Sequence, residues 1–130
     1  MKARLNNEHI ISLLNLISSN WKFVTTLYLF IIISISLYPY EEISHNETIH
    51  DKFYHVIAYV FLTIPVSLNK PKYFFSLYLF FIVLGGFVEF LQPYFNRKKE
   101  LADLIANILG IFIGSFIGHL LREKYFRPKN

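Results

Sequence analysis

The sequence contains no cysteine, and this absence excludes disulfide bonds and thiolate metal sites. Charged residues are also scarce, at 17% of the chain, against about 25% in typical soluble domains. Apolar residues are abundant instead: 54% of the chain is hydrophobic, 18% is aromatic, and the mean hydropathy is +0.39. One soluble domain of 130 residues has too little interior to bury so much apolar side chain. The composition therefore predicts a single membrane domain covering 1–130.

Four apolar segments lie at about 21–38, 53–69, 73–92 and 101–121. A helix needs about 20 predominantly apolar residues to cross a membrane, with a range of roughly 17–25. The first, third and fourth segments have this length. The second is short and contains Pro65, so it crosses only if Asp51 or Lys52 lies at one interface and Asn69 at the other. A re-entrant or interfacial helix is the alternative for this segment.

The first 20 residues have a different pattern. Ile10, Leu13, Leu14 and Ile17 recur at helical spacing with polar residues between them, which predicts an amphipathic helix lying on the membrane. A signal peptide is disfavoured, because the next apolar run is longer than a signal h-region and no small-residue cleavage site follows it. The predicted fold class is therefore all-α: a bundle of four transmembrane helices with an N-terminal amphipathic interfacial helix.

The 13 basic residues predict how the bundle is oriented, because Lys and Arg are enriched in cytoplasmic loops. With both termini in the cytoplasm, the inner side holds nine of them: Lys2, Arg4, Lys22, Lys70, Lys72, Arg122, Lys124, Arg127 and Lys129. The outer side then holds four: Lys52, Arg97, Lys98 and Lys99. Because most of the basic residues flank apolar runs, the net charge of +4 is explained by the membrane, and no nucleic-acid partner is expected.

Eight polar residues gather at the outer ends of the predicted spans. They are Asp51, Lys52, His55, Glu89, Gln92, Arg97, Asp103 and Asn107. Chance alone would scatter such residues over both membrane faces. Ionisable residues within spans are costly and are treated by default as candidates for function.

Their spacing places several of them on common helix faces. Asp51, His55 and Tyr59 are four residues apart, and Glu89 and Gln92 are three apart, so each set shares one face of its helix. The sequence therefore predicts that residues from three helices and one loop form a single polar cavity near the outer leaflet.

A stripe on the last helix supports this arrangement. Asp103, Asn107, Gly110 and Gly114 lie along one face, and Gly118 continues the four-residue spacing. Small residues at this spacing allow transmembrane helices to approach closely. The stripe therefore turns Asp103 and Asn107 toward the interior of the bundle.

The carboxylates and the histidine suit acid–base chemistry. Glu89 and His55 are the candidate acid and base, while Asp51 and Asp103 would orient partners or hold a divalent cation. No cofactor is predicted and no metal ligand is assigned, since the chain lacks an HExxH-like spacing. Structural alternatives remain open: Glu89 as an ion-pair partner or protonated hydrogen bonder, His55 as the partner of a carboxylate, and Asp103 as a favourable first-turn charge.

The run Arg97-Lys98-Lys99 directly precedes the last helix, whose first turn already carries partial positive charge. Arg97, together with Lys52, would suit an anionic headgroup, with lipid headgroups or nearby acidic residues as the alternative partners. The rest of the predicted substrate-binding set is Gln92, Asn107 and Tyr59, although Asn107 also suits an interhelical hydrogen bond and Tyr59 suits core packing.

The chain resembles the VanZ-like family of small bacterial membrane proteins. The match consists of Asp51-Lys52-x-x-His55-x-x-x-Tyr59, Glu89-x-x-Gln92, Arg97, and Asp103-x-x-x-Asn107-x-x-Gly110-x-x-x-Gly114, and it covers about residues 51–118. The resemblance implies four spanning helices, a bacterial plasma membrane and a link to resistance against teicoplanin-type lipoglycopeptides; it implies no reaction. The family often has Gly before the arginine, where this chain has Asn96, and Lys98 and Lys99 are additions to its pattern.

Three functions remain open at this stage. The first is an enzyme acting on an anionic lipid-linked or cell-envelope substrate at the outer interface. The second is a non-catalytic binder of an anionic lipid or an amphiphilic antibiotic, which should tolerate Glu89→Gln better than an acid–base enzyme would. The third is a transporter or channel subunit, although four short helices leave little room for a pathway in a monomer. Membrane lipids are expected partners of all three, and the sequence gives no indication of the oligomeric state.

Overall fold

The computed structural model describes residues 2–39 and 47–126, with side chains described over 7–39 and 50–126. The helices are α1 (Lys2–Ser19), α2 (Trp21–Ser36), α3 (Glu47–Asn69), α4 (Phe74–Leu91), the short 3₁₀ helix η1 (Gln92–Phe95) and α5 (Leu101–Phe126). No strand occurs in these two ranges, so the all-α prediction is confirmed. Two of the basic residues counted above, Arg127 and Lys129, lie outside the described residues.

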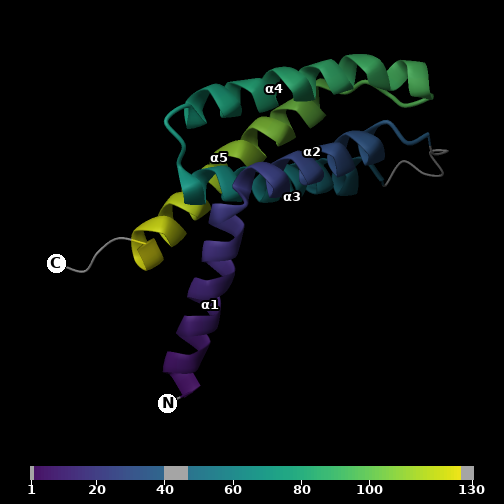
Figure 1. Ribbon diagram of the computed structural model, residues 1–130. Helices are drawn as coiled ribbons and strands as arrows, with labels where there is room; N and C mark the ends of the chain where they lie inside the picture. Colours follow the sequence, from purple (N-terminus) through teal and green to yellow (C-terminus); the bar gives the residue numbers. More distant parts are fainter. Residues whose placement is uncertain (1, 40–46, 127–130) are drawn as a thin grey trace.

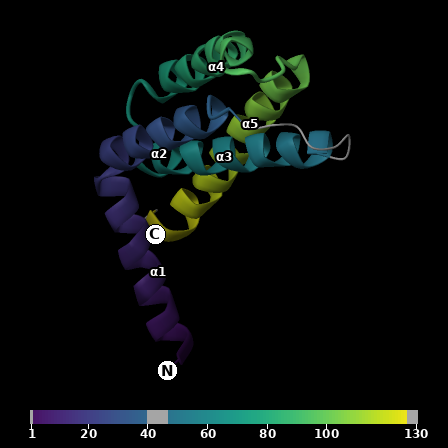
Figure 2. The ribbon, with the colours of Figure 1, turned by 90° about the vertical axis from the view of Figure 1, so that its right-hand side faces the viewer.

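Helices α2 to α5 lie together, whereas α1 extends away from them (Figures 1 and 2). The axis of α1 is bent by 78° from that of α2 at Asn20. Side chains at this corner bind the last carbonyls of α1: Ser19 Oγ donates to Asn15 O at 2.7 Å, and Asn20 Nδ2 donates to Leu16 O at 3.0 Å. Such local bonds compete with continuation of a helix, which accounts for the corner.

The centre of the bundle is the contact between α3 and α5. A Cβ atom added at Gly110 would lie 2.5 Å from Val56 O, and one added at Gly114 would lie 2.5 Å from Val60 O. The backbones of the two helices therefore touch along this stripe, which leaves no room for a side chain on α5 there. The predicted role of the glycine stripe in close helix packing is confirmed.

The end of α3 is tied to both terminal helices. Lys70 has φ 53°, a left-handed conformation that stops the helix. Arg122 Nη1 donates to Leu68 O at 2.7 Å and to Asn69 O at 3.1 Å, so that it satisfies carbonyls that a helix end leaves without partners. Asn69 Nδ2 donates in turn to Ser18 O at 3.0 Å.

The polar residues of α3 face the inside of the bundle. Thr63 Oγ1 donates to Tyr59 O at 2.6 Å, Ser67 Oγ donates to Thr63 O at 3.0 Å, and the Ser67 and Tyr78 hydroxyls lie 2.6 Å apart. Hydrogen bonds of this kind remove the cost of burying a hydroxyl. The helix also runs unbroken through Pro65, so its 23 residues have a length of about 34 Å.

Length and composition mark two helical segments as able to cross a membrane, Phe74–Phe95 and Leu101–Phe126. A third would be the bent pair of Asn7–Ser19 with Trp21–Ser36 if the two parts act as one span. The four spans expected from the sequence are therefore only partly supported. Helix α2 has 16 residues and is short alone, and α3 carries too many polar residues along its inward face.

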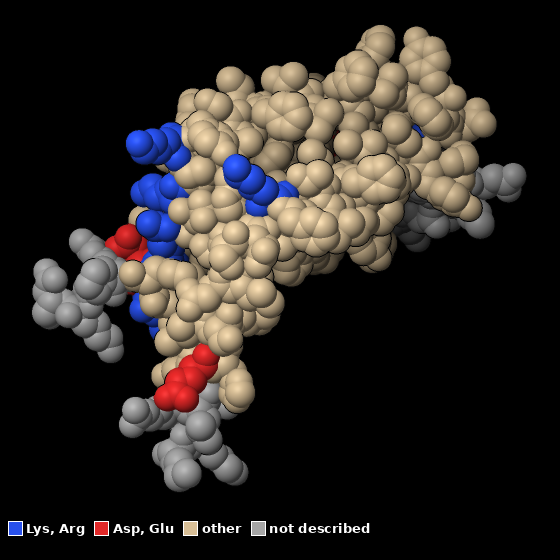
Figure 3. Space-filling view, viewed as in Figure 1, with Lys and Arg blue, Asp and Glu red and all other residues tan. Residues whose placement is uncertain are grey.

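The outer surface of the helices is strongly apolar. Large side chains point outward on every long helix of the bundle, among them Phe23, Phe53, Phe75 and Phe112. Figure 3 shows Lys and Arg gathered at one end of the molecule, beside the C-terminal part of α5 and the start of α2. An apolar belt with a basic end suits a protein surrounded by lipid.

Candidate functional site

The eight polar residues singled out above meet at the other end of the bundle, where α3 begins, α4 passes into η1, and α5 begins. We call this set the polar cluster. Its buried members are His55, Glu89, Gln92, Asp103 and Asn107, and its half-buried members are Asp51, Lys52 and Arg97. All eight therefore lie at the same end of the bundle.

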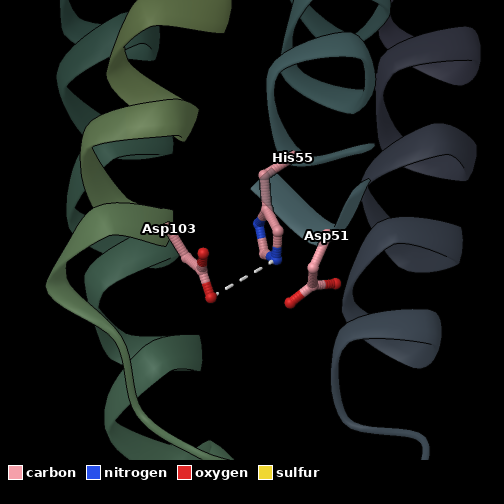
Figure 4. A group of neighbouring side chains, drawn as sticks. All are labelled: Asp51, His55 and Asp103. Carbon is pink, nitrogen blue, oxygen red and sulfur yellow. Dashed lines mark ion pairs between the residues drawn. The ribbon is translucent and has the colours of Figure 1, made fainter. Parts of the chain in front are cut away.

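His55 occupies the centre of the polar cluster, between α3 and α5. Its Nδ1 atom lies 2.9 Å from Asn107 Oδ1, and its Nε2 atom lies 3.9 Å from Asp103 Oδ2 (Figure 4). An amide oxygen only accepts hydrogen bonds, so Nδ1 carries the proton in this contact. In the neutral ring, Nε2 then presents a lone pair toward the carboxylates.

Lys52 pairs with acidic groups on the loop before α5 and on α5 itself. Its Nζ atom forms an ion pair with Glu100 and lies 3.6 Å from Asp103 Oδ1. Lys52 precedes the apolar part of α3, and the hydrogen bond to Glu100 raises the pKa of its ammonium group above the ordinary value. The predicted role of Lys52 in holding an anionic headgroup therefore competes with two carboxylates that already contact it.

Arg97 lies beside Asp51, with 3.5 Å between Arg97 Nη2 and Asp51 Oδ1. Asp51 was not among the partners that the sequence suggested for Arg97, which were Glu89 and Asp103. The backbone explains the choice: Arg97 N donates to Gln92 O at 3.1 Å, which folds the loop back over the end of η1 and toward the start of α3.

Asn96 makes this turn. Its φ of 56° and ψ of 33° are left-handed, a conformation that favours glycine and that asparagine adopts more readily than other residues. Asn96, which stands where the VanZ-like pattern often has glycine, therefore adopts a backbone conformation that favours glycine.

This observation predicts opposite results for two substitutions. Asn96→Gly should change stability by less than about 0.5 kcal/mol, whereas Asn96→Val should cost about 1–2 kcal/mol because a β-branched side chain is strained at positive φ. Denaturant titration in detergent would measure both. Equal stability of the two variants would mean that the loop does not depend on this conformation.

Glu89 lies inside the bundle, 3% exposed; among the described residues no side chain donates a hydrogen bond to its carboxylate, and the backbone N–H of Glu100 is the donor beside it. Asp103 and Asp51 are close enough to repel it, whereas Arg97 attracts it. Gln92, which is also buried, donates from Nε2 to Ser36 O at 3.4 Å and so connects η1 to α2. A buried carboxylate without a side-chain donor is a costly group, and it requires either a proton or another cation.

A cleft of about 940 Å³ opens between α2 and the first half of α3; we call it the α2–α3 cleft. One part of its wall is apolar and includes Ile31, Ile32, Ile35 and Ile57. The polar part of its wall contains His50, Asp51, His55 and Arg97.

The sequence predicted one cavity for a set of six polar residues: Asp51, His55, Glu89, Arg97, Asp103 and Asn107. Three of them, Asp51, His55 and Arg97, line this cleft, and the other three are not among its lining residues. Asp103 and Asn107 are buried on α5, and Glu89 is buried on α4. Lys52, Gln92 and Tyr59 are likewise absent from the lining.

Tyr59 packs inside the bundle. It is 3% exposed and belongs to the hydrophobic core. A Cβ atom at Gly85 would lie 2.8 Å from its hydroxyl oxygen and 3.1 Å from Asn107 Nδ2. The packing interpretation of Tyr59 thus fits the geometry better than direct contact with a ligand.

Two parts of the site were missed from the sequence. Glu100 was not among the residues that the sequence singled out, yet it pairs with Lys52. Helix α2 forms a wall of the cleft through residues that carry no charge, among them Tyr28, Ser34 and Ser36. The serines within an otherwise apolar run were the only signal in the sequence, and serines are common at helix contacts in membranes.

Comparison with known proteins found no matching family model, curated protein or solved structure.

Proposed function

We propose that this chain is a VanZ-like, multi-pass plasma-membrane protein that takes an anionic amphiphile into the α2–α3 cleft. The carrying observation is the two-part wall of that cleft. An acyl chain would lie along the isoleucines, and the headgroup would reach Arg97, Asp51 and His55. Pockets that bind such ligands combine a mainly apolar lining with a few polar groups that fix orientation.

In the proposed arrangement, α2 to α5 cross the membrane and α1 lies on its inner surface. Helix α3 would be stable within the membrane because its hydroxyl groups are hydrogen-bonded inside the bundle. The basic end would face the cytoplasm, with both termini, and the polar cluster would lie at the outer leaflet.

Two single cysteines test this orientation, since the chain has none of its own. Lys98→Cys and Lys72→Cys are matched: both positions are exposed and both lie in connections between helices, at opposite ends of the bundle. A membrane-impermeant thiol reagent applied to intact bacterial cells should label position 98 and leave position 72 unlabelled. Labelling of position 72 alone would place the polar cluster on the cytoplasmic side.

Catalysis is one version of this proposal. His55 lies on the cleft wall with a lone pair on Nε2, so it can accept a proton from a bound headgroup or from water. Glu89 lies behind the wall and would act through its neighbours. In the binding version, Arg97 and the apolar wall hold the amphiphile, and no proton is transferred.

Filling the cleft tests both versions. Ala58 lines it, so Ala58→Trp should abolish photocrosslinking of a diazirine-bearing phosphatidylglycerol that labels α2 and α3 in the parent protein. Val83→Trp, on the exposed face of α4, is the matched control and should leave crosslinking unchanged. Crosslinking that survives Ala58→Trp would exclude the cleft as the binding site.

The two versions then separate on Glu89→Gln, which changes a residue outside the cleft lining. For a binder, this variant should keep crosslinking and keep any resistance to a teicoplanin-type lipoglycopeptide that the parent chain confers on a susceptible bacterium. For an acid–base enzyme, crosslinking should remain while the phenotype disappears.

A further inference from the structure

Asp51, His55 and Asp103 each offer one ligand atom, and these atoms lie within 4.8 Å of one another. Figure 4 shows the two carboxylates on either side of the outer edge of the imidazole, one from α3 and one from α5. Metal–oxygen and metal–nitrogen bonds are about 2.0–2.2 Å. An ion placed between these atoms would need only small side-chain rotations to reach all three.

The histidine is held in the form that binds metals. His55 Nδ1 donates a hydrogen bond to Asn107 Oδ1 at 2.9 Å, so in the neutral ring the lone pair is on Nε2, 3.9 Å from Asp103 Oδ2. Metal-binding histidines usually donate their second N–H to a carboxylate or carbonyl oxygen, which fixes the tautomer and the ring orientation. Asn107, itself 2% exposed, has this supporting position.

Asp103 directs one carboxylate oxygen toward the histidine. The residue is 2% exposed, and its Oδ2 atom lies 3.9 Å from His55 Nε2. Its other oxygen, Oδ1, lies 3.6 Å from Lys52 Nζ, which also pairs with Glu100. A deeply buried carboxylate oxygen that faces a histidine lone pair is costly unless a cation or a proton lies between the two atoms.

The charges of the surrounding groups point the same way. Among the buried and half-buried side chains here, four carboxylates (Asp51, Glu89, Glu100 and Asp103) face two cationic groups (Lys52 and Arg97). If all four carboxylates are ionised and His55 is neutral, two negative charges are in excess. A bound divalent cation would balance them without any proton uptake.

We propose that Asp51, His55 and Asp103 bind one divalent transition-metal ion, Mn²⁺ or Zn²⁺. Carboxylates alone would suit Mg²⁺ or Ca²⁺, whereas the imidazole favours a transition metal. Asp51 and His55 line the α2–α3 cleft, so the open coordination positions of the ion face the cleft. The ion site depends only on these side chains, and in the proposed function the ion would meet the anionic headgroup directly.

Direct binding measurements test the site without any lipid ligand. The full chain, purified in a non-ionic detergent and stripped with EDTA, is titrated with MnCl₂ while the free ion is followed by electron paramagnetic resonance. A parallel incubation with ZnCl₂ and gel filtration is read by elemental analysis. We expect one tightly held ion per chain in each case.

Three variants locate the ion. Asp103→Asn and His55→Gln should lose it, and Asn107→Ala, which removes only the supporting contact, should weaken it about 10–100-fold. His119→Gln, an exposed histidine on α5, is the control and should bind as the parent does. Asp51→Asn changes a half-exposed ligand, so it gives an answer even if the buried variants do not fold.

Either of two results would overturn the proposal: no saturable binding by the parent chain, or binding that Asp51→Asn and His55→Gln leave unchanged. Phosphatidylglycerol crosslinking of the EDTA-stripped chain separates this outcome from the proposed function. If the stripped chain crosslinks the lipid and the titration finds no bound ion, the cleft is supported and the metal site is rejected; if the parent chain binds an ion but does not crosslink the lipid, the metal site is supported and the proposed function is rejected.

Discussion

Gly114→Leu is expected to cause a large loss of stability. A side chain at this position would meet backbone atoms of α3: the Cβ alone would lie 2.5 Å from Val60 O and 2.9 Å from Val60 Cα. Backbone atoms within a helix cannot rotate aside as a side chain can. Overpacking usually costs about 1–3 kcal/mol, and we expect the upper part of that range here. Thermal unfolding in detergent would measure it.

Gly86 provides a matched control within the same bundle. The nearest heavy atoms to a Cβ at Gly86 are the two methyl groups of Leu104, at 3.8 and 4.0 Å. Gly86→Leu should therefore be tolerated. Gly86→Ala should even gain up to about 1 kcal/mol from helix propensity, whereas Gly114→Ala should lose stability. If the two glycines respond alike, α3 and α5 are not in backbone contact.

Arg97→Gln is the second large effect that we expect. It removes a cation from a cluster that already holds an excess of carboxylates, and its side chain is only 10% exposed. Breaking a fully buried pair costs roughly 3–5 kcal/mol. Because the Asp51 side chain is 29% exposed, we expect about 2–3 kcal/mol here. Denaturant titration in detergent is the measurement.

The double variant identifies the partner. Asp51→Asn alone should cost less than Arg97→Gln, since it lowers the excess negative charge, and the two changes together should cost less than their sum by about 1–2 kcal/mol. Lys99→Gln is the control: its ammonium group lies over the Phe90 ring, and an exposed contact of this kind contributes less than about 1 kcal/mol. Strict additivity of Asp51→Asn and Arg97→Gln would remove the ion pair from the description of the site.

Much of the fold follows from patterns in the sequence. Apolar runs and the residues that flank them place each helix within a few residues of its observed bounds, except that α3 begins earlier and α5 ends later than expected. Spacing also predicted correctly that the Asp103–Gly114 face of α5 turns inward, because a four-residue period places residues on one helix face whatever surrounds it.

Partner choice within the polar cluster could not be derived in this way. Arg97 reaches Asp51 because Asn96 adopts a left-handed conformation, and a sequence does not show which conformation a loop residue adopts. The α2–α3 cleft could not be predicted from the sequence either, since its size depends on how closely two apolar helices approach each other. The prediction of four spans went beyond what length and composition support, because α2 is short alone and α3 carries polar residues on its inward face.

The contact between α3 and α5 has a consequence for biosynthesis. Helix α5, which packs on α3 through backbone contact, is made after α4, which separates the two in the chain. Until α5 is made, His55 has no Asp103 or Asn107 beside it, and the bonds that Arg122 gives to the end of α3 are missing. In the proposed membrane arrangement, α3 would therefore need a polar or protein-lined environment while two further helices are made. The insertion machinery of the membrane, rather than lipid, would then be its first neighbour.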